Sequence, residues 1–191
     1  MAKDLMAVYG TRSGQEEELN KLLESASKPT DGADMGGMLM VVGAGSACVY
    51  TTAWSAVQQP DDILTANNLG VALKDMGELS QALQVLKYAE SLKPNAALIQ
   101  GNLGWVYWEA GELSQAATQF RKALNIAPDM VSANLGMGLS LNCQGKKAEA
   151  EEYLRKALKE RHSTMGIMAY RQNVQTGKPG QDARYRLAGR D

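Results

Sequence analysis

The sequence has few of the side chains on which most catalytic, metal-binding and secreted proteins depend. Its 191 residues include two cysteines, Cys48 and Cys143, and one histidine, His162. Two cysteines cannot form the framework of several disulfides that holds small secreted domains together. One histidine with no reactive partner near it in the sequence does not indicate acid–base catalysis, and no group of Cys and His has the spacing of a metal site. Reduced thiols and a cytoplasmic protein are therefore expected.

The sequence also lacks a dense run of charge of either sign. The formal net charge at pH 7 is −1, and a local excess of base occurs in residues 161–191, which carry six basic and two acidic side chains. Arms that bind nucleic acids usually carry a denser run of Lys and Arg. We therefore expect no nucleic-acid partner, and we expect residues 177–191 to form a flexible basic tail.

Between Met35 and Pro60 charged residues are missing altogether. Such a run is compatible with a weak membrane span, or with an export signal that ends at a lipoprotein-type cysteine, Cys48. An export signal is expected to start with positive charge, yet the six residues before this run include neither Lys nor Arg. Glycine, serine and threonine dilute the run too much for a typical membrane span. We therefore expect no membrane partner.

What the sequence has instead is an internal repeat with a period of 34 residues. The hexapeptide Gly-Glu-Leu-Ser-Gln-Ala occurs at Gly77–Ala82 and again at Gly111–Ala116. A repeat of this length predicts a solenoid of stacked units. Because the register also runs through the uncharged segment without a gap, we interpret that segment as a degenerate first copy. The small residues that recur in four copies are Gly36/Gly70/Gly104/Gly138, Gly43/Gly77/Gly111/Gly145, Cys48/Ala82/Ala116/Ala150 and Ser55/Ala89/Ala123/Ala157.

Each recurring small residue has a steric explanation. Glycine inside a helix costs about 1 kcal/mol relative to alanine, so the first column predicts a close approach of two helices, with Gly70 facing Ala82 or Ala89. The second column predicts a left-handed glycine at the end of each first helix. The residue that follows each repeat-closing proline is expected to cap the next helix; these residues are Asp61, Asn95 and Asp129.

The columns resemble those of the tetratricopeptide repeat. The resemblance implies an all-α fold, a right-handed superhelical solenoid of helix–turn–helix repeats over residues 29–162, with copies at 29–60, 61–94, 95–128 and 129–162. The sequence departs from the family where a large aromatic is common early in the first helix, because Gly32, Ala66, Gln100 and Asn134 stand there. Within the N-terminal segment 1–28, an amphipathic helix is expected over residues 13–26, and residues 1–12 give no periodic signal. A capping helix is expected over residues 163–176.

In the resembled family, the first helices line a concave groove in which peptides bind. In this chain, two features of the residues that would line such a groove favour peptide binding. Asn68 and Asn102 share a column, and an amide can pair with any peptide backbone. Trp105 and Trp108 lie three residues apart, and partly exposed tryptophans concentrate binding energy at interfaces. The predicted peptide-binding residues are Leu64, Asn67, Asn68, Val71, Leu98, Asn102, Trp105, Trp108, Leu135 and Leu139.

These observations favour a non-catalytic interaction module that binds a peptide segment of a partner protein, with no cofactor, no metal and no specified oligomeric state. Two alternatives stay open. The chain could be an exported, lipid-anchored periplasmic assembly factor that resembles pilus pilotins, with a mature chain starting at Cys48. It could also be the repeat part of a larger enzyme.

Overall fold

The computed structural model describes residues 1–14, 16–24, 35–36, 38–39 and 44–159. These residues form helices and no strands, in agreement with the predicted all-α repeat fold. The chain divides into two compact units, Met1–Lys93 and Pro94–Asp191. Within the described ranges, none of the helices combines the length and the apolar character that a membrane crossing requires.

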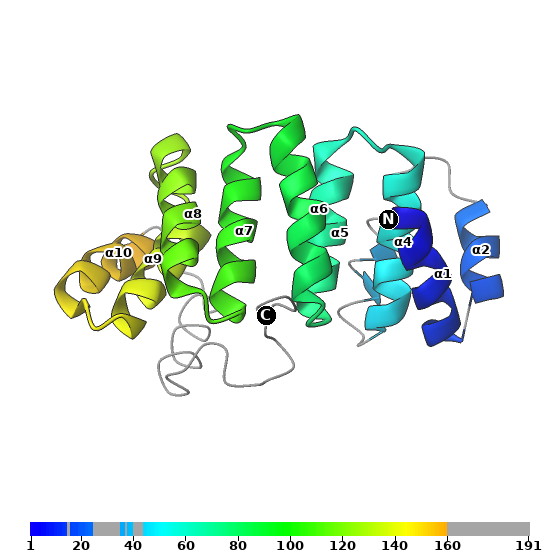
Figure 1. Cartoon of the computed structure of the whole chain (residues 1–191), viewed down its shortest axis with the longest axis horizontal. Helices are drawn as coiled ribbons and strands as arrows, with labels where there is room; N and C mark the ends of the chain where they lie inside the picture. The colour runs from blue at the N-terminus through cyan, green and yellow to red at the C-terminus, as the bar shows by residue number, and fades with distance from the viewer. Residues whose placement is uncertain (15, 25–34, 37, 40–43, 160–191) are drawn as a thin grey trace, which may run out of the picture. The chain divides into compact units, whose positions relative to one another are not determined.

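The first unit is built around α4. Helices α1 and α5 both pack against α4, α6 packs against α5, and α2 contacts α1 and α4. Figure 1 shows α1 lying alongside α4. The helices of this unit are α1 (Ala2–Ser13), α2 (Glu16–Glu24), α4 (Gly45–Gln58), α5 (Ile63–Asp75) and α6 (Leu79–Leu92).

The described part of the second unit, residues 94–159, consists of two helical hairpins. Helix α7 packs against α8, α9 packs against α10, and α9 also contacts α7 and α8 (Figure 1). Because α9 has neighbours on several sides, six consecutive residues from Gly136 to Leu141 are buried. The helices are α7 (Ala97–Glu109), α8 (Leu113–Ile126), α9 (Val131–Cys143) and α10 (Lys147–Lys159).

The second column of glycines ends the first helix of each hairpin, as predicted. Gly77, Gly111 and Gly145 have φ angles of 78°, 80° and 81°, in the left-handed region that glycine adopts without steric strain. Gly43, the first member of this column, lies outside the described residues. The same turn therefore closes α5, α7 and α9.

The first column of glycines makes the predicted close approach, but to a different partner. A Cβ atom added at Gly70 would lie 2.6 Å from Cγ of Leu86, so Gly70 faces this leucine and not Ala82 or Ala89. The residue 16 positions later is the nearest neighbour in all four copies, at 2.6–2.7 Å. The pairs are Gly36 with Thr52, Gly70 with Leu86, Gly104 with Phe120 and Gly138 with Leu154. Glycine is needed because a side chain of the second helix occupies the space of a Cβ atom there, and periodicity alone did not identify this partner.

The predicted helix caps are wrong by one residue. Asp62, and not Asp61, is the N-cap of α5, and its carboxylate accepts hydrogen bonds from the backbone N–H groups of Leu64 and Thr65 at 3.2 and 3.1 Å. Asp61 accepts a hydrogen bond from the hydroxyl of Tyr88 instead. The N-caps of α7 and α9 are Ala96 and Met130, and neither makes a side-chain cap.

Helix α1 was not apparent in the sequence. Leu5, Tyr9 and Gly10 are its fully buried residues, so its apolar face is too narrow to produce a clear helical period. Ser13 is the last residue of α1, and Gly14 caps that helix with a φ of 66°. The second N-terminal helix therefore begins at Glu16, inside the predicted range of 13–26.

Candidate interaction surfaces

Two tryptophans on α7 form a partly exposed aromatic pair in the second unit. Trp105 and Trp108 lie three residues apart, so one helix face carries both rings. Their ring centroids are 5.8 Å apart, with an interplanar angle of 72°. Trp105 also packs edge-on against Phe120, with centroids 5.3 Å apart. Because Phe120 is fully buried, Trp105 is anchored to the core on one side and half-exposed on the other.

The indole N–H of Trp108 distinguishes it from Trp105. Its nitrogen Nε1 is buried and has no hydrogen-bond acceptor among the described residues, although the residue as a whole is only half-buried. A buried donor without an acceptor is unfavourable by about 1–3 kcal/mol. Trp108 therefore carries an unused donor in addition to its apolar surface.

Phe120 explains why the column of asparagines ends at the last repeat. A Cβ atom added at Gly136 would lie 2.2 Å from Cζ of Phe120, while Gly104 approaches the same ring from α7 at 2.6 Å. The ring is thus held between glycines of two helices. An asparagine at position 136, as at positions 68 and 102, would overlap with it. The predicted pairing of Asn68 and Asn102 along a peptide stays a prediction.

The other predicted groove residues differ in their exposure to solvent. Leu64 and Leu98 are 55% and 43% exposed, and Asn68 is exposed as well. Val71, Asn102 and Leu135 are half-buried.

Two predicted groove residues lie inside the protein. Leu139 is 2% exposed because α9 is covered by its neighbours, and Asn67 is 5% exposed. The amide Nδ2 of Asn67 donates a 3.4 Å hydrogen bond to Oδ1 of Asn68. The groove residues predicted from the sequence therefore include two interior residues, because spacing along a helix does not reveal how deeply that helix is packed.

Two polar residues occupy the position where the resembled family commonly has a large aromatic, and both stabilise the connection before their helix. Gln100 donates from Nε2 to the carbonyl oxygen of Pro94 at 3.0 Å, and Asn134 donates from Nδ2 to that of Pro128 at 2.9 Å. Both side chains are 2% exposed. They bind the chain segment six residues earlier, so they serve the fold and are not available to a ligand.

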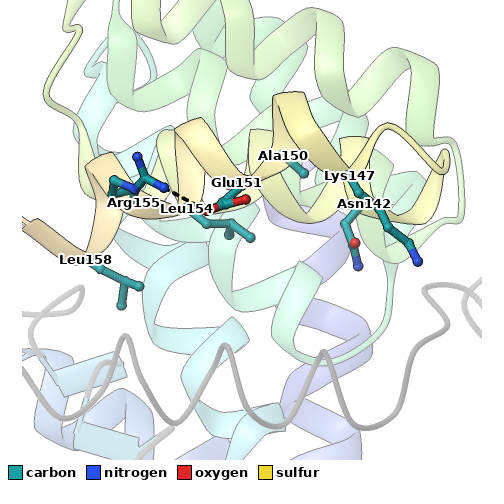
Figure 2. A pocket seen from close by; sticks show the side chains of 7 residues that line it. All are labelled: Asn142, Lys147, Ala150, Glu151, Leu154, Arg155 and Leu158. Carbon is teal, nitrogen blue, oxygen red and sulfur yellow. Dashed lines mark hydrogen bonds and ion pairs between the residues drawn. The ribbon is translucent and has the colours of Figure 1, made fainter.

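A shallow pocket of about 470 Å³ lies on α10 and the end of α9. Figure 2 shows Lys147 and Asn142 at one end and Leu158 at the other, with Arg155 pointing toward Glu151 beside Leu154. Arg155 and Glu151 form an ion pair of 2.7 Å, so neither charge is isolated. The lining residues are Asn142, Lys147, Ala150, Glu151, Leu154, Arg155 and Leu158. This set contains no nucleophile paired with a base.

The two cysteine thiols have raised pKa values and are therefore weak nucleophiles. Both cysteines are free, and burial raises the pKa of the Cys48 thiol to about 11. Cys143 is exposed, and partial burial of its thiol raises its pKa as well. Across the described parts of the chain, no three His, Cys, Asp or Glu residues are grouped so that they could hold a metal ion.

Comparison with known proteins identifies the repeat. Residues 62–129 match the sequence model of a family described as "Tetratricopeptide repeat", and residues 135–167 match a second model with the same description. No curated protein sequence matches this chain.

Many solved structures resemble the fold at low sequence identity, among them the following three. The crystal structure of MamA is 23% identical with a TM-score of 0.60, and the match covers 78% of this chain and 92% of that one. TTC0263, a thermophilic repeat protein of Thermus thermophilus, is 17% identical with a TM-score of 0.69, covering 92% and 100%. YrrB, described as having an unusual peptide-binding site, is 18% identical with a TM-score of 0.60, covering 85% and 88%.

Proposed function

Because this chain belongs to the tetratricopeptide repeat family, we propose that it is a non-catalytic interaction scaffold that binds a peptide segment of a partner protein. The observation that carries the proposal is the Trp105–Trp108 pair on α7, with the exposed Leu98 two helical turns before Trp105. Partly exposed aromatic side chains on a rigid helix provide a large contact area with little loss of side-chain entropy.

The proposed peptide-contacting surface excludes the two buried residues. On the second unit it consists of Leu98, Asn102, Trp105, Trp108 and Leu135. Leu64, Asn68 and Val71 of the first unit are proposed as a separate contact surface. Asn102 contributes an amide that can both donate and accept, which suits a peptide backbone.

Substitution at Leu98 tests this surface, with Ile126 as a matched control. Leu98 on α7 and Ile126 on α8 are both 43% exposed and belong to the same unit. Tagged full-length chains with Leu98→Arg or Ile126→Arg are used to capture partners from the native host. Leu98→Arg should lose the partner that the wild type and Ile126→Arg both retain. Equal capture by all three chains, at equal thermal stability, would exclude this surface.

The export alternative finds no support in the surroundings of Cys48. The thiol is 3% exposed within α4, between residues that are themselves buried, so attachment of a lipid would require this helix to unfold. We therefore propose a cytoplasmic protein whose partner is neither a nucleic acid nor a membrane. No observation favours a catalytic role, alone or as part of a larger enzyme.

A further inference from the structure

The two first helices of the second unit, α7 and α9, are almost uncharged. Their only charged side chain is that of Glu109, at the end of α7, and neither helix contains Lys or Arg. Bases of this unit lie on its second helices instead, where Arg121, Lys122 and Lys156 are exposed. A peptide that lies along the first helices therefore meets a negative charge on them and no positive one.

Glu109 lies on the same helix face as the proposed contact residues of α7. Leu98, Asn102, Trp105 and Glu109 follow one another by four, three and four residues, which is the spacing of a single helical stripe. Along this stripe the side chains change from aliphatic to amide, then to aromatic and finally to acidic. The acidic end coincides with the C-terminal end of α7, where the partial negative charge of a helix also favours cations.

The two indoles beside Glu109 form a corner. The ring planes of Trp105 and Trp108 are inclined by 72° with centroids 5.8 Å apart, so they provide two nearly perpendicular walls. Trp105 is fixed by its edge-on contact with the buried Phe120, and both tryptophans are only half-buried, so each keeps some exposed surface. A cation within about 6 Å of an indole centroid is attracted by the ring, and Trp attracts cations more strongly than Tyr or Phe does.

We propose that this corner, made by Trp105, Trp108 and Glu109, binds a cationic side chain of the partner peptide, in the first place arginine. This assignment rests on the peptide-binding function proposed above and specifies the chemistry of the partner segment. A guanidinium group is planar, so it stacks on an indole face while its N–H groups point to a carboxylate at its edge. An acidic segment would find no cation on α7 or α9 with which to pair.

The stripe also sets the distance between this cation and an apolar side chain of the peptide. Leu98 lies about 10 Å from Trp105 and about 16 Å from Glu109 along the axis of α7, at a rise of about 1.5 Å per residue. An extended peptide advances about 3.3 Å per residue, so it covers these distances with roughly three to five residues. The partner segment should therefore carry an apolar residue against Leu98 and an arginine roughly three to five positions away.

Selection from a peptide library tests the chemistry and the function separately. Random peptides displayed on phage are selected on the full-length chain, and those that also bind the neutral variant Leu98→Ser are discarded. The retained peptides should be enriched in Arg and depleted in Asp and Glu. Peptides retained without this charge preference would overturn the proposal and leave the proposed function standing. If no peptide depends on Leu98, the proposed function fails, and the assignment of the corner fails with it.

A matched pair of peptides isolates the positive charge. One selected peptide is synthesised with arginine and again with citrulline, which has nearly the same shape without the charge, and binding is measured by fluorescence anisotropy. The arginine peptide should bind the wild-type chain roughly three- to thirty-fold more tightly. The Glu109→Gln and Trp108→Leu chains should each lose most of this preference. Asp129→Asn should retain it, because it removes one negative charge from an exposed position of the same unit.

Three results would overturn the proposal. Equal affinity of the two peptides for the wild-type chain would mean that no cation is bound in the corner. A preference that both Glu109→Gln and Trp108→Leu retain in full would place the cation elsewhere. The third result concerns a full-length chain with Arg184→Gln, Arg186→Gln and Arg190→Gln, which the peptides should bind as they bind the wild type. Binding to this chain alone would assign the corner to the protein's own basic tail.

Discussion

The packing of Phe120 between two helices makes a quantitative prediction about Gly136. A Cβ atom at position 136 would lie 2.2 Å from Cζ and 2.5 Å from Cε1 of the buried Phe120 ring. These distances are far below ordinary contact, so Gly136→Ala must move the ring or helix α9. The ring cannot yield freely, because Gly104 supports it from α7 at 2.6 Å.

The change in unfolding free energy that Gly136→Ala causes is the sum of two effects of opposite sign. Overpacking of a core costs about 1–3 kcal/mol. Replacing a helical glycine by alanine stabilises the helix by about 1 kcal/mol. The net loss of unfolding free energy for Gly136→Ala is therefore up to about 2 kcal/mol. A loss of about 1 kcal/mol lowers the Tm of a chain of this size by about 2–4 °C.

A double-mutant cycle isolates the steric term. Phe120→Leu shortens the side chain, and leucine is already present in this column at positions 86 and 154. In the Phe120→Leu background, Gly136→Ala should be neutral or stabilising by about 1 kcal/mol. The coupling between the two sites should accordingly be about 1–3 kcal/mol.

Urea unfolding followed by circular dichroism and tryptophan fluorescence measures this cycle, since Trp105 packs on Phe120. Gly101→Ala is the matched control, because its Cβ would meet only the flexible end of Met130, at 3.0 Å. That substitution should be far less damaging. Equal effects of Gly136→Ala in both backgrounds would refute the steric explanation of this glycine.

Three further predictions concern separate parts of the chain. Asp62→Ala removes two hydrogen bonds at the start of α5 and should lower the unfolding free energy by about 1 kcal/mol, measured in urea; an unchanged midpoint would contradict the cap. Only Cys143 should react with a thiol reagent at pH 8 in the folded protein, and reaction of both thiols would contradict the burial of Cys48. The pKa of Cys48 is raised from 9.0 to about 11, so the unfolded chain releases this proton first and the thiol's contribution to stability should fall as the pH rises from about 9 to about 11. The capping helix predicted over residues 163–176 lies outside the described residues.

The period of 34 residues predicted the all-α repeat fold and the left-handed turns. Gly77, Gly111 and Gly145 could be assigned because a left-handed position depends on local backbone geometry, which leaves a direct mark on the sequence. The partner of Gly70 could not be assigned in the same way. Both Ala82 and Leu86 lie on the core side of α6, and which of them meets the glycine depends on the vertical offset of two packed helices.

The candidate site could be predicted from the sequence only in part. Spacing along α9 placed Leu139 on the predicted surface, but contacts with α7, α8 and α10 leave it buried. The cover that α1 provides was also missed, because Leu5 and Tyr9 are too few to define a period. A comparison of the repeat columns would have revealed the face of α4 that α1 covers, since Tyr50 and Ala53 replace residues that are polar or charged in the later copies.

Site-specific photo-cross-linking tests the central claim most directly, namely that the first helix of the third repeat contacts a partner peptide. A photoreactive amino acid is introduced at Leu98 in one full-length chain and at the equally exposed Ile126 in another, and both are irradiated in the native host. Mass spectrometry of the adducts identifies the attached segment. The account predicts a single partner segment attached at position 98 and none of it at position 126. Attachment of that segment at position 126 alone, or no adduct at position 98, would contradict it.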